Sequence, residues 1–195
     1  MLIEGGTGNG YKAEVNESHQ LFTRAVTESI EHYTNHDKQR AFAITCNQSP
    51  TAANDCFFWI KNTDTARDLV IEGVMIGHKD ATAVDPEIYM KLGDNGTANV
   101  ATDVTPVNLN TDSPYTATCT CQKGADLDNA GAAISGGAEF GRFLFADTAG
   151  QNVSSAMKSF PMDVILGPNG SFSLWATDAG ATYYLNIPIW FIDRE

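Results

Sequence analysis

The chain has 195 residues, of which 43% are hydrophobic and 18% charged, and its formal net charge is −12. This length suits one domain with a sizeable core plus an extension. The acidic balance and the lack of a basic run argue against nucleic-acid binding, because phosphate contacts need Lys and Arg. No stretch approaches the ~20 apolar residues of a membrane span, so no membrane partner is expected.

The chain begins with a glycine-rich stretch, Gly5–Gly10. Glycine costs entropy to order, so we expect this stretch to become ordered only against a neighbour. A Gly-x-Gly-x-x-Ala pattern starting at Gly8 loosely matches a dinucleotide fingerprint, but that motif must follow a buried strand and open a helix. Met1–Ile3 is too short for that strand, and Tyr11–Val15 alternates. The start is therefore predicted to be a flexible arm.

Two further features of the N-terminal region bear on its organisation. Met1–Gly5 lacks the basic and apolar regions of a signal peptide, so we expect synthesis and folding in a cytoplasm. Leu21–Tyr33 fits both a helical stripe and, through its threonines and valine, a strand. We predict a short strand at Leu21–Thr27 and a helical turn at Glu28–Tyr33. The arm is predicted to comprise residues 1–36, followed by a β domain at residues 37–195.

From Ala41 onward the pattern is that of strands and turns, with no long helical period. Strands are predicted at Ala41–Cys46, Cys56–Ile60, Leu69–Gly77, Glu87–Leu92, Thr105–Asn110, Tyr115–Gln122, Phe140–Phe145, Met162–Leu166, Ser171–Trp175 and Thr182–Ile192. Gly73 predicts a bulge or a bend, Pro106 predicts an edge strand, and Asn169-Gly170 predicts a hairpin between its flanking strands. Such a pattern indicates an antiparallel β-sandwich or a barrel.

The four cysteines are expected to be reduced and mostly buried. Cys119 and Cys121 are two residues apart, so on a strand they point to the same face. Cys46 and Cys56 flank a loop and are close enough in sequence to approach, but nothing requires a bridge. The spacing of the four cysteines relative to the four histidines matches no zinc-binding pattern, so no metal and no cofactor are predicted.

The remaining groups of histidine and acidic residues give little indication of a catalytic or metal-binding site. His19, His32 and His36 cluster in the arm, and Asp85 and Glu87 flank a proline, but ordinary solvated side chains explain both groups. The acidic residues Asp94, Asp103, Asp112, Asp126 and Asp128 fall in loops; the last two resemble part of a calcium loop without its glycine and closing glutamate.

The aromatic residues raise one further possibility. Trp59, Trp175 and Trp190 suggest a sugar platform, but their strongly apolar surroundings favour core packing, and an exposed Tyr89 or Tyr115 would suit a sugar better. No nucleophile, base and orienting group are visible together, so the protein is not expected to be an enzyme.

Both ends of the chain resemble tailed-bacteriophage virion structural proteins. The resemblance rests on Gly6-Thr7-Gly8-Asn9-Gly10-Tyr11-Lys12-Ala13-Glu14-Val15, on Leu21 with Arg24-Ala25-Val26-Thr27, and on Leu166–Phe172 followed by the final strand Tyr184–Ile192. It covers roughly the first 40 and the last 35 residues. The middle matches only in the rhythm of its strands.

The resemblance implies a jelly-roll-like β-sandwich displayed in many copies on a virion, after synthesis in the host cytoplasm. It implies a capsid decoration or cement protein, homotrimeric, that binds between major capsid proteins. The alternatives are a tail, neck or fibre-associated protein, or a carbohydrate-binding module used in host attachment. The expected partner-binding residues all lie in the arm: Gly8, Asn9, Tyr11, Leu21, Phe22, Arg24 and Val26.

Overall fold

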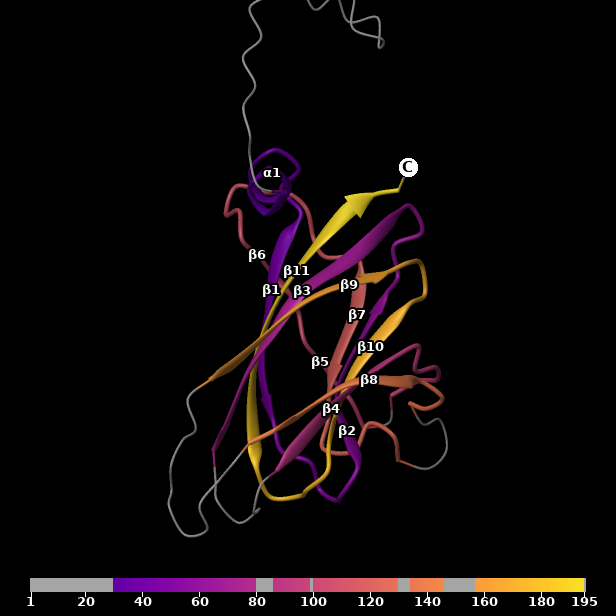
Figure 1. Ribbon diagram of the computed structural model, residues 1–195. Coiled ribbons are helices and arrows are strands. Elements are labelled where there is room, and N and C mark those ends of the chain that lie inside the picture. Colours follow the sequence, from indigo (N-terminus) through magenta and orange to yellow (C-terminus); the bar gives the residue numbers. More distant parts are fainter. Residues whose placement is uncertain (1–29, 80–85, 99, 130–133, 146–156, 195) are drawn as a thin grey trace, which may run out of the picture. The chain divides into compact units, whose positions relative to one another are not determined.

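The structure, a computed structural model, describes residues 30–79, 86–98, 100–129, 134–145 and 157–194 (Figure 1). The chain divides into two units, Met1–Ile30 and Glu31–Glu195, and every strand below belongs to the second. In the part of the chain that the structure describes, the secondary structure is one short helix and eleven strands. They are α1 (Ile30–His36), β1 (Ala41–Gln48), β2 (Asp55–Asn62), β3 (Arg67–Lys79), β4 (Glu87–Leu92), β5 (Thr102–Asp103), β6 (Val107–Asn108), β7 (Cys119–Lys123), β8 (Ala138–Leu144), β9 (Lys158–Leu166), β10 (Ser171–Ala176) and β11 (Thr182–Asp193).

The strands form two antiparallel sheets that pack into a β-sandwich, as the sequence predicted. One sheet has the order β6-β1-β11-β3-β9 and the other the order β5-β7-β2-β10-β4-β8. When the short insertion β5–β7 is set aside, the eight remaining strands have the order β1-β11-β3-β9 in one sheet and β2-β10-β4-β8 in the other, which is the order of two Greek keys. This is the jelly-roll topology.

The core lies between the sheets and follows from the period-2 alternation of the strands. Phe42 and Ile44 of β1 point inward, as do Ile187 and Ile189 of β11. The opposite sheet contributes a second apolar layer, and Phe57 of β2 stacks on Tyr183 at a ring-centroid distance of 5.0 Å. The long strand β3 carries the predicted bulge, since its register with β9 shifts between Ile71 and Gly73.

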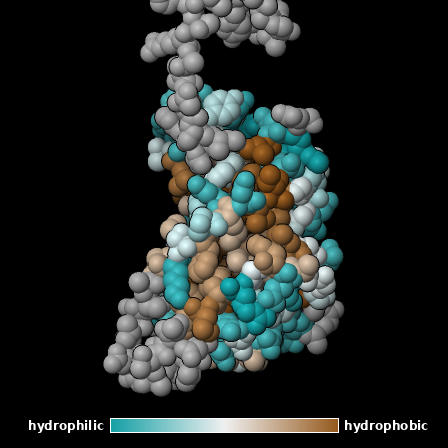
Figure 2. Space-filling model, viewed as in Figure 1, coloured by the Kyte–Doolittle hydropathy of each residue, from teal (hydrophilic) through white to brown (hydrophobic). Residues whose placement is uncertain are grey.

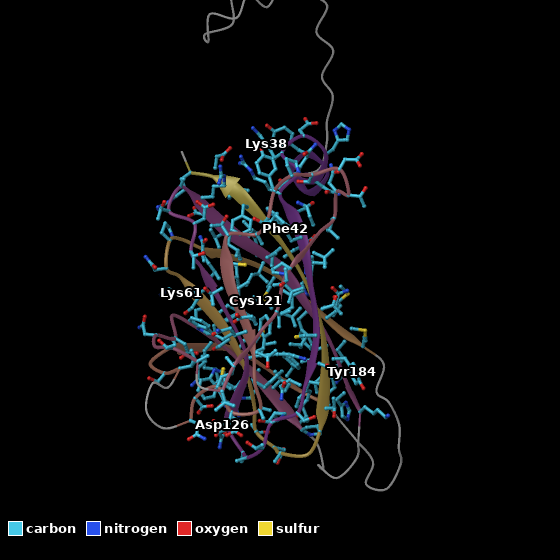
Figure 3. The ribbon with its side chains drawn as sticks, turned by 180° about the vertical axis from the view of Figure 1, so that it is seen from behind. Lys38, Phe42, Lys61, Cys121, Asp126 and Tyr184 are labelled. Carbon is cyan, nitrogen blue, oxygen red and sulfur yellow. The ribbon has the colours of Figure 1, made fainter. Side chains whose placement is uncertain are left out.

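The segment between β4 and β8 closes one edge of the sandwich. Its β6 pairs with β1 and its β7 pairs with β2, so both sheets are extended at the same edge. Figure 3 views the molecule from behind relative to Figure 1; its labels Phe42 and Cys121 mark buried side chains of β1 and β7. The β5–β6 region confirms Thr105–Asn110 as a short edge strand, although only Val107 and Asn108 pair.

The predicted hairpin around Asn169-Gly170 is wrong. The chain does turn there, with Asn169 at φ 64° and the Gly170 N–H donating to the Gly167 carbonyl over 2.8 Å. However, β9 pairs with β3 while β10 pairs with β2 and β4, so the turn carries the chain from one sheet to the other. A turn signal determines where a chain reverses, whereas burial of both inner faces determines its pairing partners.

The helical turn expected near Tyr33 is part of α1, while the predicted strand Leu21–Thr27 lies outside the described residues. The helix is held at the closed edge: Asn110 Nδ2 donates to the Asn35 carbonyl over 3.1 Å, and the Arg40 N–H donates to the Thr34 carbonyl over 2.9 Å. Among the described residues, no helix is long and apolar enough to cross a membrane.

Candidate functional site

The seven arm residues predicted to bind a partner, Gly8 to Val26, lie outside the described residues, as do His19 and Asp85. The structure therefore leaves their role a prediction. What it does show is a surface on the body of the protein that the sequence did not single out.

This surface lies at the edge of the sandwich opposite the insertion. There β8 ends one sheet and β9 ends the other, and neither has a further strand partner among the described residues. The two strands meet through side chains: the rings of Phe143 and Phe160 stack at 3.9 Å, and Lys158 Nζ donates to the Leu144 carbonyl over 2.6 Å. The edge is thus a junction of two sheets rather than a gap.

Apolar side chains line this junction, and we call them the apolar seam. Its members are Phe140, Phe160, Met162 and Val164. Phe140 is 43% exposed, and the other three are half-buried against the core. Leu144 and Ile165 are also exposed, but they alternate onto the outer faces of their sheets, where Leu144 pairs with Glu87 and Ile165 with Val70. Figure 2 shows brown, apolar atoms running along the face that carries β9 and the end of β8. The junction therefore leaves part of the apolar core open at one edge of the protein.

The same edge is poorly suited to main-chain strand addition. Pro161 has no N–H to donate, and the register between β4 and β8 shifts between Met90 and Lys91, which places a bulge in the pairing of β8. Proline, lysine and bulges are the usual means by which edge strands avoid pairing with other sheets. A partner at the seam would therefore be bound mainly through side chains.

On the outer face of the six-stranded sheet, a buried carboxylate ties the insertion to the fold. Asp94 follows β4 and is 2% exposed. Its Oδ1 accepts from the Gly137 N–H over 2.7 Å, and its Oδ2 accepts from the Ser173 hydroxyl and from Trp175 Nε1, the latter over 3.2 Å. Ser171 Oγ donates to the Asp94 carbonyl over 2.6 Å. With its donors all supplied by the protein, this carboxylate is structural.

A second acidic group is Asp55 with Asp126 and Asp128, whose carboxylate oxygens lie within 4.8 Å of one another. Burial raises the pKa of Asp126, and the charge of Asp55 raises it further. Burial also raises the pKa of Asp128, against a hydrogen bond from the Cys56 N–H. The spacing of residues 126 and 128 indicated a pair of carboxylates; Asp55, from the start of β2, was missed because only folding brings it there.

The aromatic residues considered for sugar binding are mostly covered. Trp59, Trp175 and Trp190 are between 4% and 6% exposed, and Lys91 Nζ lies 3.6 Å from the centroid of the Trp175 ring. Tyr89 is also buried, whereas Tyr115 is exposed beside Arg40. The three indoles thus offer no platform to a sugar ring.

The remaining candidates are ordinary structural groups. Glu87 accepts a hydrogen bond from Arg142 over 2.9 Å. All four cysteines are free. Cys119 and Cys121 share the inner face of β7, as their spacing predicts, and burial raises the pKa of Cys46 to about 11 and that of Cys119 to about 12.

The sequence analysis did not predict the seam, because its residues come from two segments that are far apart in the sequence and were predicted only as separate strands. The alternation of β9, with exposed residues between half-buried ones, was the available signal. Comparison of the chain with protein-family models, with curated proteins and with solved structures finds no match.

Proposed function

We propose that this protein is a non-enzymatic, homo-oligomeric structural protein of a tailed-bacteriophage virion, and that it decorates the capsid by binding between major capsid proteins. The observation that carries the proposal is the apolar seam, a row of partly buried apolar side chains at an open edge of a protein of net charge −12. A chain with this charge repels its own copies except where an uncharged surface allows close approach.

The fold supports the proposal by analogy. Jelly rolls serve as viral capsid domains, and also as lectins. A fold does not by itself imply a function, so the proposal depends on the apolar seam. Buried indoles disfavour the lectin alternative, while the tail, neck and fibre locations remain alternatives to the capsid.

The test has two parts, both on the full-length chain. Light scattering after size exclusion measures the oligomeric state, for which we expect a trimer at micromolar concentration. The purified, labelled chain is then mixed with virions of the phage that encodes it, and electron microscopy locates the added density; we expect it on the head.

The matched variants are Phe140→Asp in the seam, and Tyr184→Asp on the outer face of β11 as the control. The seam variant should be monomeric and should not bind particles. The control variant should form the same oligomer as the parent chain and should bind particles as the parent chain does. A parent chain that is monomeric and absent from particles, or that binds glycans on an array, would contradict the proposal.

A further inference from the structure

We propose that Cys119 and Cys121 form a binding site for one soft monovalent metal ion, of the class of Cu(I), in a cavity beside β7. The site lies at the closed edge of the sandwich, opposite the apolar seam, and the inference is independent of the proposed function. Both residues also pack against the core, so metal binding is a second role for them.

The cavity exists because the chain leaves β7 partway along that strand. β5 pairs with β7 as far as Asp103, and the Val104 N–H still donates to the Cys121 carbonyl over 2.8 Å. Beyond Val104 the chain crosses to the other sheet, where Val107 pairs with β1. This divergence leaves a cavity of about 270 Å³. Asp103 and Thr105 line it and are exposed, so an ion can enter from solvent.

The two cysteines line this cavity from adjacent positions on one face of β7. Cys119 is half-buried and Cys121 is 3% exposed. Residues two apart on a strand are about 6.8 Å apart along its axis. Metal–thiolate bonds are about 2.3 Å long, so the two sulfurs of a linear complex are about 4.6 Å apart. Rotation of the two side chains is therefore enough to bring both sulfurs to one ion.

Negative groups surround the Cys121 thiol. Burial raises the pKa of Cys121, and the charges of the Cys119 and Cys46 thiolates and of the Asp103 carboxylate raise it further. Repulsion of this kind keeps the free thiols protonated, whereas a cation between two thiolates replaces that repulsion with attraction. The crowding of these groups thus favours two thiolates only when a metal ion is bound.

The donors select a soft ion that accepts two ligands. Thiolate sulfur favours Cu(I), whereas Zn²⁺ takes four ligands and Ca²⁺ and Mg²⁺ take oxygen. Besides the two thiols, the described lining of the cavity offers the carboxylate of Asp103, which already accepts from Gln122 Nε2 over 2.9 Å. As the ion binds, each thiol releases its proton to solvent, and two S–Cu bonds form without any change of oxidation state.

Competition for Cu(I) with the chelator bicinchoninate tests the site, using the full-length, reduced chain in the absence of oxygen. We expect the parent chain to withdraw one equivalent of Cu(I) and to show a sulfur-to-copper charge-transfer band. Cys119→Ser and Cys121→Ser should each lower the affinity about 100-fold, because each removes one of two ligands.

Cys56→Ser is the matched control. This thiol is fully buried in a separate cluster of residues and donates to the Phe58 carbonyl over 3.5 Å, so its loss should leave the affinity unchanged. Melting temperatures without copper show whether each variant folds. If a serine variant does not fold, Cys119→Ala or Cys121→Ala, which adds no polar atom to the core, repeats the test.

X-ray absorption of the parent complex should count two sulfur ligands. A parent chain that leaves the Cu(I) on the chelator would overturn the inference. So would an equal loss of affinity in Cys56→Ser, or a third sulfur ligand that disappears in Cys46→Ser.

Discussion

The hydroxyl of Ser173, in the middle of β10, donates a hydrogen bond to the buried carboxylate of Asp94, in the insertion that follows β4. The two residues are 79 positions apart in the sequence. Buried carboxylates stabilise a fold only when donors surround them, and this one has three donors from two segments: Gly137 just before β8, and Ser173 and Trp175 of β10. The contact therefore couples the closure of the insertion to the sheet beneath it.

A double-mutant cycle measures this coupling. Ser173→Ala and Asp94→Ala should each lower the free energy of unfolding by about 1–3 kcal/mol, because each leaves a buried polar partner unpaired. The coupling energy should exceed about 1 kcal/mol. The control cycle uses Asp103 and Gln122, an exposed pair at 2.9 Å, whose coupling should be close to zero. Equal couplings in urea titrations of the two cycles would show that the buried contact has no special weight.

Gly137 is expected to tolerate no side chain. A Cβ there would lie 2.5 Å from Asp94 Oδ1 and 2.9 Å from the Asp94 nitrogen. Gly137→Ala should therefore lower the free energy of unfolding by about 2 kcal/mol or more, since the backbone must shift and lose its bond to the carboxylate. Gly167→Ala is the control, because the nearest atom to its Cβ would be 3.8 Å away. Thermal unfolding of both variants compares them directly, and equal melting temperatures would contradict the expectation.

The carboxylates around Asp126 should make the protein less stable at neutral pH. The pKa of Asp126 is raised by burial and by Asp55, so its folded value lies above its unfolded value. Its ionisation therefore costs stability above the raised pKa, and this cost disappears below the unfolded pKa. Asp126→Asn should raise the melting temperature at pH 7 and leave it unchanged near pH 3. An identical gain from Asp112→Asn, an exposed loop residue, would mean that overall charge rather than local repulsion is responsible.

Asp64 should show the opposite pH dependence. Burial raises its pKa, but hydrogen bonds from the Ala66 N–H and from Arg67 outweigh burial and lower it. The stability that it contributes is present above the unfolded pKa and is lost as the pH falls through the folded pKa. Asp64→Asn should cost about 1–2 kcal/mol at pH 7 and little at pH 2. A constant cost across this range, measured by urea unfolding, would show that charge plays no part in the contact.

The four thiols should react slowly in the native protein. Burial raises the pKa of Cys46 to about 11 and that of Cys119 to about 12, and it also raises the pKa of Cys56 and Cys121. Because the thiolate is the reactive form, a disulfide reagent at pH 8 should label fewer than one thiol per chain within minutes. In urea all four should react rapidly. Rapid labelling of a thiol without denaturant, located by peptide mapping, would contradict the burial of that residue.

The strands themselves could be predicted from the sequence. Glu87–Leu92 has the bounds that its apolar run and the following turn cluster indicate, and the bulge at Gly73 is where a glycine interrupts a long strand. These features depend on alternation and on turn residues, which act between near neighbours. The closing role of the insertion could not be predicted in this way, because only the folded structure shows that β6 pairs with β1 and β7 with β2 at the same edge of the two sheets.

By itself, then, the sequence determined the class of fold and the positions of most strands, because side-chain alternation and turn chemistry are local. It also determined that the chain is strongly acidic and begins with a segment rich in glycine. Only the tertiary structure decided that β9 and β10 belong to different sheets, that Asp55 joins Asp126 and Asp128, and that β8 and β9 meet at an apolar seam. The physical reason is the same in each case. Which segments pair or meet depends on how the inner apolar faces of the two sheets are buried against each other, and residues from the whole chain contribute to that burial.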